Sequence, residues 1–224
     1  MSCSATPIVF VVDSDISIRE SLAILIQRAG WQSQTFASAT EFLAHQKSAV
    51  PSCLVLDLTL PDLNGLELQE RISTERCDIP IIFFSSHVDI SMAVKAIKRG
   101  ALEFLIKPTD FETLLSAIRS AIKRSETVLN RETEIHRLRS DYESLSRRER
   151  EVMAGVASGL LNKEVGTQLG ISEITVKAHR GNVMRKMKAD SFAHLVNMAS
   201  RLRAIRHLAP GAPPRIAEAS QFVN

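Results

Sequence analysis

Cysteine is scarce in this sequence, and its spacing does not suggest a disulfide framework or a zinc site. The three cysteines, Cys3, Cys53 and Cys77, are an odd number and include no Cys-x-x-Cys pair. Disulfide frameworks need paired cysteines, and zinc sites need closely spaced ligands. We expect one cysteine in an N-terminal tail and two as small core residues.

Long apolar runs are absent too. The chain starts with Met-Ser-Cys-Ser-Ala-Thr-Pro, which lacks the basic region and the apolar stretch of a secretory signal. No later run approaches the roughly 20 apolar residues that a membrane-spanning helix needs. We therefore expect a cytoplasmic protein that does not associate with a membrane.

Glycine and proline are both missing between Pro108 and Gly155. Within this stretch Ile135 and Tyr142 are at heptad spacing, and the lack of helix breakers predicts a continuous helix. Fewer than three heptads favour an ordinary amphipathic helix over a coiled coil. We assign a helical linker to residues 125–145.

The net charge of +3 is unevenly divided along the chain. Residues 1–120 carry 10 basic and 14 acidic side chains, a net charge of −4, whereas residues 121–224 carry 18 and 11, a net charge of +7. The basic second half is therefore a candidate for binding a polyanion such as nucleic acid. Charge alone does not decide this, because a basic face is more often simply solvated.

Short apolar runs alternate with amphipathic stretches over residues 1–124. The runs IVFVV, CLVL and IIFF contain no alternating polar residues, which is typical of strands covered on both faces. The amphipathic stretches between them predict the covering helices. The expected fold class is α/β, a doubly wound five-stranded parallel sheet.

Polar residues follow four of the predicted strands: Asp13, Asp57, Ser85 and Lys107. In such sheets, reactive groups gather where the carboxyl ends of the strands meet. Two carboxylates brought together there suit Mg²⁺, and a carboxylate partly neutralised by metal can attack phosphorus. Lys107 would offset developing negative charge, and Ser85 would donate a hydrogen bond to a phosphoryl oxygen. Taken singly, each residue is more often a cap, a turn former or a solvated group.

The stretches VVDSDISIRESL, LVLDLTLPDLNGLEL and PIIFFSSHVDISMAVKAIKRGALEFLIKP closely resemble the receiver domain of two-component response regulators of the FixJ/NarL kind. The resemblance implies a flavodoxin-like fold, a phosphoacceptor and a magnesium site. It implies the following assignments: Asp57 as phosphoacceptor, Ser85 as the hydroxyl residue, Lys107 as the lysine followed by a cis bond to Pro108, Phe104 as the switch aromatic, and Asp13 with Asp57 as metal ligands.

The sequence departs from that family at the metal site. Ser14 stands where the family usually has a second acid that binds the metal directly. We expect weaker Mg²⁺ binding as a result, and leave open whether Ser14 or Asp15 contributes. The loop Ser86-His87-Val88 also lacks the glycine that close relatives commonly carry beside the histidine, and a stiffer loop would alter the switch.

Helix start and stop signals recur in residues 146–208. Ser146 can cap a first helix that Gly159 ends, and Gly170 can end a second helix. Ser172 can cap a third. The short turn between the second and third helices predicts a helix-turn-helix. Pro-Gly-Ala-Pro-Pro then ends regular structure, so 209–224 is assigned as a flexible tail.

The third of these helices has two distinct faces. Val176, Val183 and Met187 share an apolar stripe, and the opposite face is small and basic. An ordinary bundle with a charged outer face would look similar. However, LSRREREV and GLLNKEVGTQLGISEITVKAHR resemble the LuxR-type DNA-binding domain. That face and the resemblance give these DNA-contact candidates: Lys163, Thr175, Lys177, Ala178, His179, Arg180, Asn182 and Arg185. The fourth helix, Ser191 to about Arg203, resembles the dimer-forming one.

The two resemblances together predict a phosphorylation-dependent transcription regulator, not an enzyme. A sensor histidine kinase would donate phosphate to Asp57, the receivers would pair, and the homodimer would bind double-stranded DNA. RNA polymerase is a further candidate partner. The kinase, the signal, the operator and the sign of the output stay open.

Two alternatives remain at this point. Asp13-Ser14-Asp15 also resembles the nucleophile motif of haloacid-dehalogenase-type phosphatases, although that leaves the DNA-binding half unexplained. Ser14 also leaves open a DNA-binding regulator whose receiver is a phosphorylation-independent dimerisation domain.

Overall fold

The computed structural model describes residues 6–46, 49–75, 79–86 and 89–208. The chain divides into two compact units, Met1–Glu132 and Thr133–Asn224. Within the described ranges, no helix is both long and apolar enough to cross a bilayer. Cys3, Cys77, the loop residues His87 and Val88, and the predicted tail lie outside the described residues.

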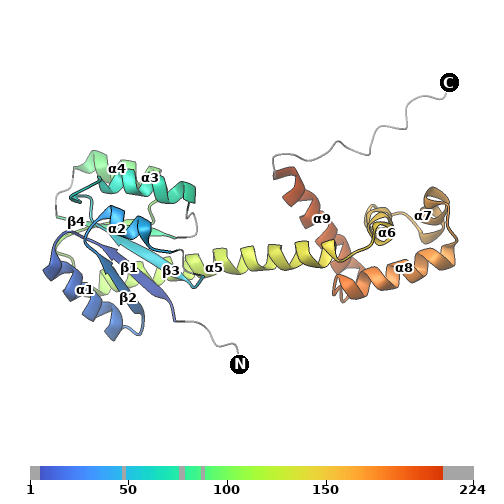
Figure 1. Ribbon diagram of the computed structural model, residues 1–224, viewed down its shortest axis with the longest axis horizontal. Coiled ribbons are helices and arrows are strands. Elements are labelled where there is room, and N and C mark those ends of the chain that lie inside the picture. The colour runs from blue at the N-terminus through green and yellow to red at the C-terminus, as the bar shows by residue number, and fades with distance from the viewer. Residues whose placement is uncertain (1–5, 47–48, 76–78, 87–88, 209–224) are drawn as a thin grey trace, which may run out of the picture. The chain divides into compact units, whose positions relative to one another are not determined.

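The first unit is built on a five-stranded parallel sheet of order β2-β1-β3-β4-β5, which confirms the predicted fold class. Figure 1 shows this sheet with its flanking helices. The strands are β1 (Ile8–Val12), β2 (Gln32–Phe36), β3 (Ser52–Leu56), β4 (Ile81–Ser85) and β5 (Glu103–Ile106). The helices are α1 (Ile16–Arg28), α2 (Ala39–Ala44), α3 (Gly65–Glu75), α4 (Ile90–Lys98) and α5 (Phe111–Glu143).

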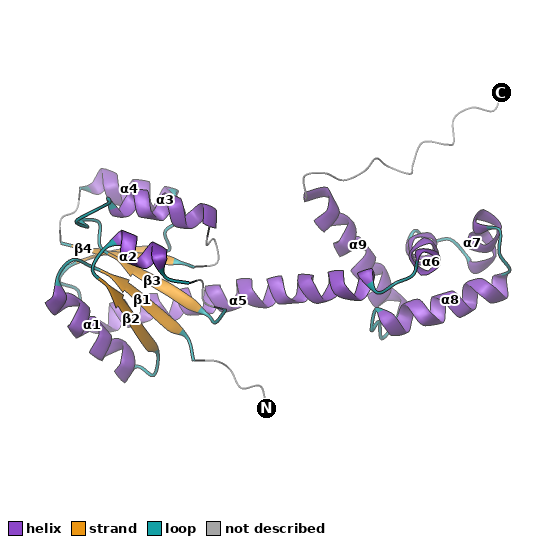
Figure 2. Ribbon diagram, in the orientation of Figure 1, coloured by secondary structure: helices purple, strands orange, loops and turns teal. Residues whose placement is uncertain are grey.

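The sheet is covered on both faces, which explains its uninterrupted apolar runs. Alternate residues of β1 enter different cores: Phe10 packs with residues of α2, α3 and α4, whereas Val9 packs with residues of α1 and α5. Figure 2 shows α1 on the opposite side of the sheet from α3 and α4. Because successive side chains of a strand point to opposite faces, a strand with two buried faces needs apolar residues throughout.

The apolar runs did not reveal β2 or α2. β2 has the sequence QSQTF, pairs only with β1, and buries only Phe36 among its residues. An edge strand of this kind lacks the apolar run that marks the inner strands. α2 is only six residues long and buries Ala39 and Phe42, too short to show a clear helical period.

The second unit contains α6 (Arg147–Ala157), α7 (Asn162–Leu169), α8 (Glu173–Lys186) and α9 (Phe192–Leu208). Its helix ends follow the predicted signals. Ser146 and Glu149 form a capping box at α6, Gly170 ends α7 with a φ of 67°, and Ser172 caps α8. Residues 170–172 separate α7 from α8, so the predicted helix-turn-helix is confirmed. α9 extends past Arg203, the residue near which its end was predicted.

The helical region between the sheet and α6 is a single element with the last receiver helix, because α5 runs unbroken from Phe111 to Glu143. Its C-terminal part belongs to the second unit. Leu138 is buried in that unit's core, Glu134 pairs with Arg201 at 2.7 Å, and Asp141 pairs with Lys188 at 2.8 Å. The domain limits at 124, 145 and 208 stay predictions.

Candidate functional site

Four strand ends bring the predicted polar residues to one edge of the sheet. Val12 is in register with Leu56, and Ser85 is in register with Ile106. The next residues along these strands are tied by backbone hydrogen bonds: Asp57 donates to the Val12 carbonyl, and Lys107 donates to the Ser85 carbonyl, each at 2.9 Å. The parallel register therefore fixes where the side chains leave the core.

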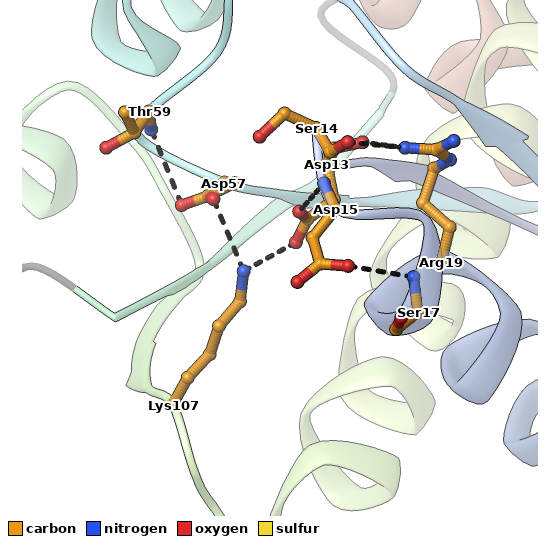
Figure 3. Close-up of polar contacts among 8 residues, drawn as sticks. All are labelled: Asp13, Ser14, Asp15, Ser17, Arg19, Asp57, Thr59 and Lys107. Carbon is orange, nitrogen blue, oxygen red and sulfur yellow. Dashed lines mark hydrogen bonds and ion pairs between the residues drawn. The ribbon is translucent and has the colours of Figure 1, made fainter.

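The ammonium group of Lys107 lies between two carboxylates (Figure 3). Its Nζ is 2.5 Å from Oδ2 of Asp13 and 3.3 Å from Oδ2 of Asp57. Asp13 and Asp57 are only 3% and 9% exposed, so water screens their mutual repulsion poorly. The lysine offsets that repulsion directly, and the Lys107–Pro108 bond is cis as predicted.

The loop after β1 is held by its own hydrogen bonds. The Asp15 N–H donates to Oδ1 of Asp13, while the Asp15 carboxylate accepts the Ser17 N–H as the N-cap of α1 (Figure 3). Arg19 donates to the carbonyl oxygens of Asp13 and Ser14 at 2.7 and 2.9 Å. Asp15 is therefore already used as a cap, and Ser14 is the exposed neighbour of Asp13.

The donor set at this edge fits a hydrated magnesium ion. Asp13 and Asp57 supply two carboxylates, and Mg²⁺ typically uses one or two carboxylates together with waters and phosphate oxygens. Across the described ranges, no group of three or more His, Cys, Asp or Glu side chains is arranged to hold a metal. The two carboxylates fit the ion, and a third acidic ligand is missing.

The two predicted switch residues lie on neighbouring strands. Ser85 is the last residue of β4 and is 1% exposed. Phe104, in β5, is half-buried, and its ring stacks on that of buried Phe83 with centroids 5.7 Å apart. The side chain of Phe104 therefore packs against the core on the side of α3 and α4.

The predicted faces of α8 are separated as expected. Val176, Val183 and Met187 are fully buried. On the opposite face, Ile174 is 80% exposed. Four of the DNA-contact candidates on this face are also exposed or accessible: Lys177, Ala178, Arg185 and the half-buried Asn182. Lys163 and Thr175 are exposed as well.

Two further DNA-contact candidates lie beside the buried stripe of α8. His179 and Arg180 are half-buried. The Arg180 guanidinium lies over the Phe192 ring at 4.5 Å and donates to Asn162 at 3.4 Å. Arg180 therefore joins α8 to α7 and α9, which gives it a structural role whatever it contacts outside the domain.

Comparison with known proteins identifies the family to which each unit is similar. Residues 9–119 match the response regulator receiver domain, and residues 143–199 match the bacterial regulatory proteins of the luxR family. The chain is 45% identical over 199 residues to nodulation protein W of Bradyrhizobium diazoefficiens, covering 89% of this chain and 88% of that one. It is 37% identical over 193 residues to transcriptional regulatory protein FixJ of the same organism, covering 86% and 94%. The chain is also similar to the solved structure of response regulator StyR, with 42% sequence identity and a TM-score of 0.80. That match covers 88% of this chain and 100% of the StyR chain.

This chain belongs to the response regulators. It joins a receiver domain to a LuxR-type DNA-binding domain, and such proteins are transcription regulators of two-component systems, not enzymes. A receiver implies a sensor kinase as partner and generally binds Mg²⁺ at its phosphorylation site, and the LuxR-type domain implies DNA binding. The phosphatase interpretation of Asp13-Ser14-Asp15 is therefore dropped.

Gly65 of the regulator is a site residue that the sequence analysis did not single out. A Cβ on Gly65 would lie 2.5 Å from the Asp57 carbonyl oxygen and 2.9 Å from the Leu58 Cα. Its N–H donates to the Leu58 carbonyl at 2.9 Å, so α3 begins directly against the loop that carries Asp57. The Asn64-Gly65 pair is a turn signal that could have indicated this.

Asp62 anchors the same loop to α2. Its carboxylate accepts hydrogen bonds from the Thr40 hydroxyl, the Thr40 N–H and the Ala39 N–H, at 2.5, 2.7 and 3.1 Å. These bonds, the hydroxyl's above all, lower the pKa of Asp62 to about 2. Because α2 was not predicted, the sequence offered no partner for this carboxylate.

We predict that Gly65→Ala lowers the free energy of unfolding of the receiver by about 1–3 kcal/mol, as overpacking against backbone does. Urea denaturation followed by the fluorescence of Trp31, the only tryptophan, would measure this. Gly181→Ala, in the second unit, is the control for an added methyl group that meets nothing within 4 Å, and it should leave the Trp31 transition unchanged. A Gly65→Ala protein as stable as the wild type would contradict the close contact.

Proposed function

We propose that this regulator accepts a phosphoryl group on Asp57 from a sensor histidine kinase, and that phosphorylation promotes receiver pairing and DNA binding. The observation that carries the proposal is the cluster of Asp57, Asp13 and Lys107 at the carboxyl edge of the sheet. The Asp57 backbone is hydrogen-bonded to β1 and its carboxylate pairs with Lys107, yet the residue remains 9% exposed. We assign its action to the cytoplasm, where the DNA that such regulators bind lies.

The transfer needs little from the protein beyond position and charge. An oxygen of Asp57 bonds to phosphorus while the bond to the kinase histidine nitrogen breaks, and that nitrogen takes up a proton. Lys107 offsets the charge on the phosphoryl oxygens, and Ser85 donates a hydrogen bond to one of them. Bound Mg²⁺, held by Asp13 and Asp57, would neutralise charge on the same oxygens.

Phosphorylation acts through its preference for one of two receiver states. In our proposal, Ser85 moves toward the phosphoryl group and Phe104 turns further inward, which favours the pairing-competent state. Two paired regulators present two α8 helices to half-sites about one helical turn apart, with α9 forming the contact between DNA-binding domains. RNA polymerase remains a further candidate partner, to which no surface is assigned.

The alternative function is a DNA-binding regulator with a phosphorylation-independent receiver. The observation that favours it is Ser14, which supplies no further acid beside Asp13 and Asp57. Such a receiver would pair without a phosphoryl group.

Radiolabelled acetyl phosphate tests the main proposal. With Mg²⁺ present, we expect the wild type to incorporate label and to shift toward dimer in sedimentation velocity, and Asp57→Asn to do neither. Asp110→Asn is the control, because that exposed carboxylate caps the start of α5, where it accepts hydrogen bonds from Thr113. Labelling of Asp57→Asn would move the acceptor elsewhere, and a dimeric wild type that takes no label would favour the alternative.

The missing acid at position 14 makes a separate prediction about the metal. One further carboxylate near the ion is expected to add about 1.4 kcal/mol or more of attraction, which corresponds to a tenfold tighter site. Ser14→Asp should therefore lower the Mg²⁺ concentration for half-maximal labelling roughly tenfold, with a matching change in Kd by calorimetry. Ser14→Asn, of similar shape and no charge, should behave like the wild type, and equal affinities for both variants would refute this account.

The exposed face of α8 makes a prediction about DNA. On an operator selected from random sequences, Arg185→Ala should weaken binding by about 1–3 kcal/mol and relax the preference at one base pair. Lys163→Ala should weaken binding to every sequence and reduce the salt slope by about one. Arg119→Ala, on the receiver part of α5, is the control. Unchanged affinity and selectivity in Arg185→Ala would remove that residue from the interface.

A further inference from the structure

The second unit contains a small hollow between the end of α5, α6 and α9. Its volume is about 100 Å³. Tyr142, Arg150 and Arg203 line it together with apolar residues, among them Met153 and Leu202. Met153 and Leu202 are 2% and 8% exposed, so one end of the hollow is apolar and closed by the core.

Arg150 lines this hollow, and one of its side-chain nitrogens lacks a hydrogen-bond acceptor among the described residues. Its guanidinium lies over the Tyr142 ring at 5.3 Å, and its Nη2 donates to the Glu143 carbonyl at 2.8 Å. Its Nε is buried and has no hydrogen-bond partner in the described part of the chain. A buried donor on a charged group that lacks an acceptor is costly, and native structures usually supply one.

The hollow is positively charged. Among the described residues that line it, two are arginines and none is Asp or Glu. Arg203, on α9, is exposed. Two guanidinium groups beside an apolar floor form a site that combines carboxylate recognition with hydrophobic contact.

We propose that this hollow binds a small monocarboxylate with a flat apolar body. The carboxylate accepts hydrogen bonds from the arginines, with Arg203 at the solvent side, and the body packs against Tyr142, Met153 and Leu202. At about 100 Å³ the hollow is smaller than the roughly 150 Å³ cavity that encloses a whole benzene ring, so the ring enters it only in part and the charged end of the ligand extends toward solvent.

The site goes beyond the proposed function, because it is independent of Asp57. Its ligand contacts the end of α5, α6 and α9 together, and a ligand that binds only the folded state stabilises it by mass action. The regulator would thereby receive a second chemical input, at its DNA-binding unit.

Tyr142 allows a direct test, because it is the only tyrosine of the chain. The full-length regulator labelled with 3-fluorotyrosine should give one ¹⁹F NMR resonance. We expect benzoate at constant ionic strength to shift it saturably, and benzamide, of the same shape without the charge, to shift it at least tenfold less effectively. No saturable shift with benzoate, or equal binding of benzamide, would overturn the proposal.

Variants assign the shift to the hollow. Arg203→Gln removes an exposed charge and should weaken benzoate binding at least tenfold, whereas Arg139→Gln, exposed on α5 outside the hollow, should not. Ala154→Leu enters the hollow from an exposed position and should abolish the shift. Wild-type affinity in Arg203→Gln and Ala154→Leu would overturn the proposal. A resonance that moves with protein concentration and does not respond to benzoate would also overturn the proposal. That result would show that a second copy of the chain fills the hollow.

Discussion

The ion cluster of Lys107 with Asp13 and Asp57 is the interaction on which the receiver site depends. β1 and β3 are neighbours, so their parallel register brings the two aspartates together at one edge. Adjacent strands are only about 4.8 Å apart, and two charges at that spacing repel by about 0.9 kcal/mol in water and about 3.5 kcal/mol at an effective dielectric constant of 20. Lys107 leaves β5, two strands from β3, and its side chain passes the end of β4 to reach both acids. The Lys107 side chain thus joins the ends of β1, β3 and β5, and its backbone N–H joins β4 through the Ser85 carbonyl. The order of the strands is what allows this.

The same cluster explains why a charge change at Asp57 would be felt beyond Asp57. Under the proposed reaction, Lys107 must divide its attraction between Asp13 and a phosphoryl group that carries more charge than the carboxylate did. Ser85 and Phe104 lie on the two strands that Lys107 spans, and the Lys107 N–H already bonds the Ser85 carbonyl. A rearrangement of the lysine therefore acts on the strands that carry both switch residues. On the other side of Asp57, the loop is held by the close approach of Gly65 to the Asp57 carbonyl and by the hydrogen bonds of Asp62 to α2.

The sequence allowed prediction of the inner strands and the residues at their ends, because strands buried on both faces must be apolar throughout and strand ends are where a parallel sheet exposes chemistry. It predicted five strands but did not locate β2, whose polar edge sequence buries little, and it did not indicate α2, which is too short to show a period. The role of Asp62 could not be predicted either, because its hydrogen-bond partners are the first residues of α2. Gly65 is a different case: its turn signal was visible, but the contact with the Asp57 carbonyl depends on how α3 packs, which one sequence does not specify.

The helical unit shows where such prediction ends. Caps mark helix ends locally, so Ser146, Gly170 and Ser172 could be assigned from sequence alone. Helix surfaces are less certain, because a residue beside the buried stripe can turn either way, and Arg180 turns toward Phe192 and Asn162. The hollow beside Arg150 is even harder to predict from the sequence. Tyr142 and Arg203 line it together only because the end of α5 packs with α6 and α9. Sites at strand ends follow from topology, whereas sites between helices follow from packing, and only the first kind can be predicted from one sequence.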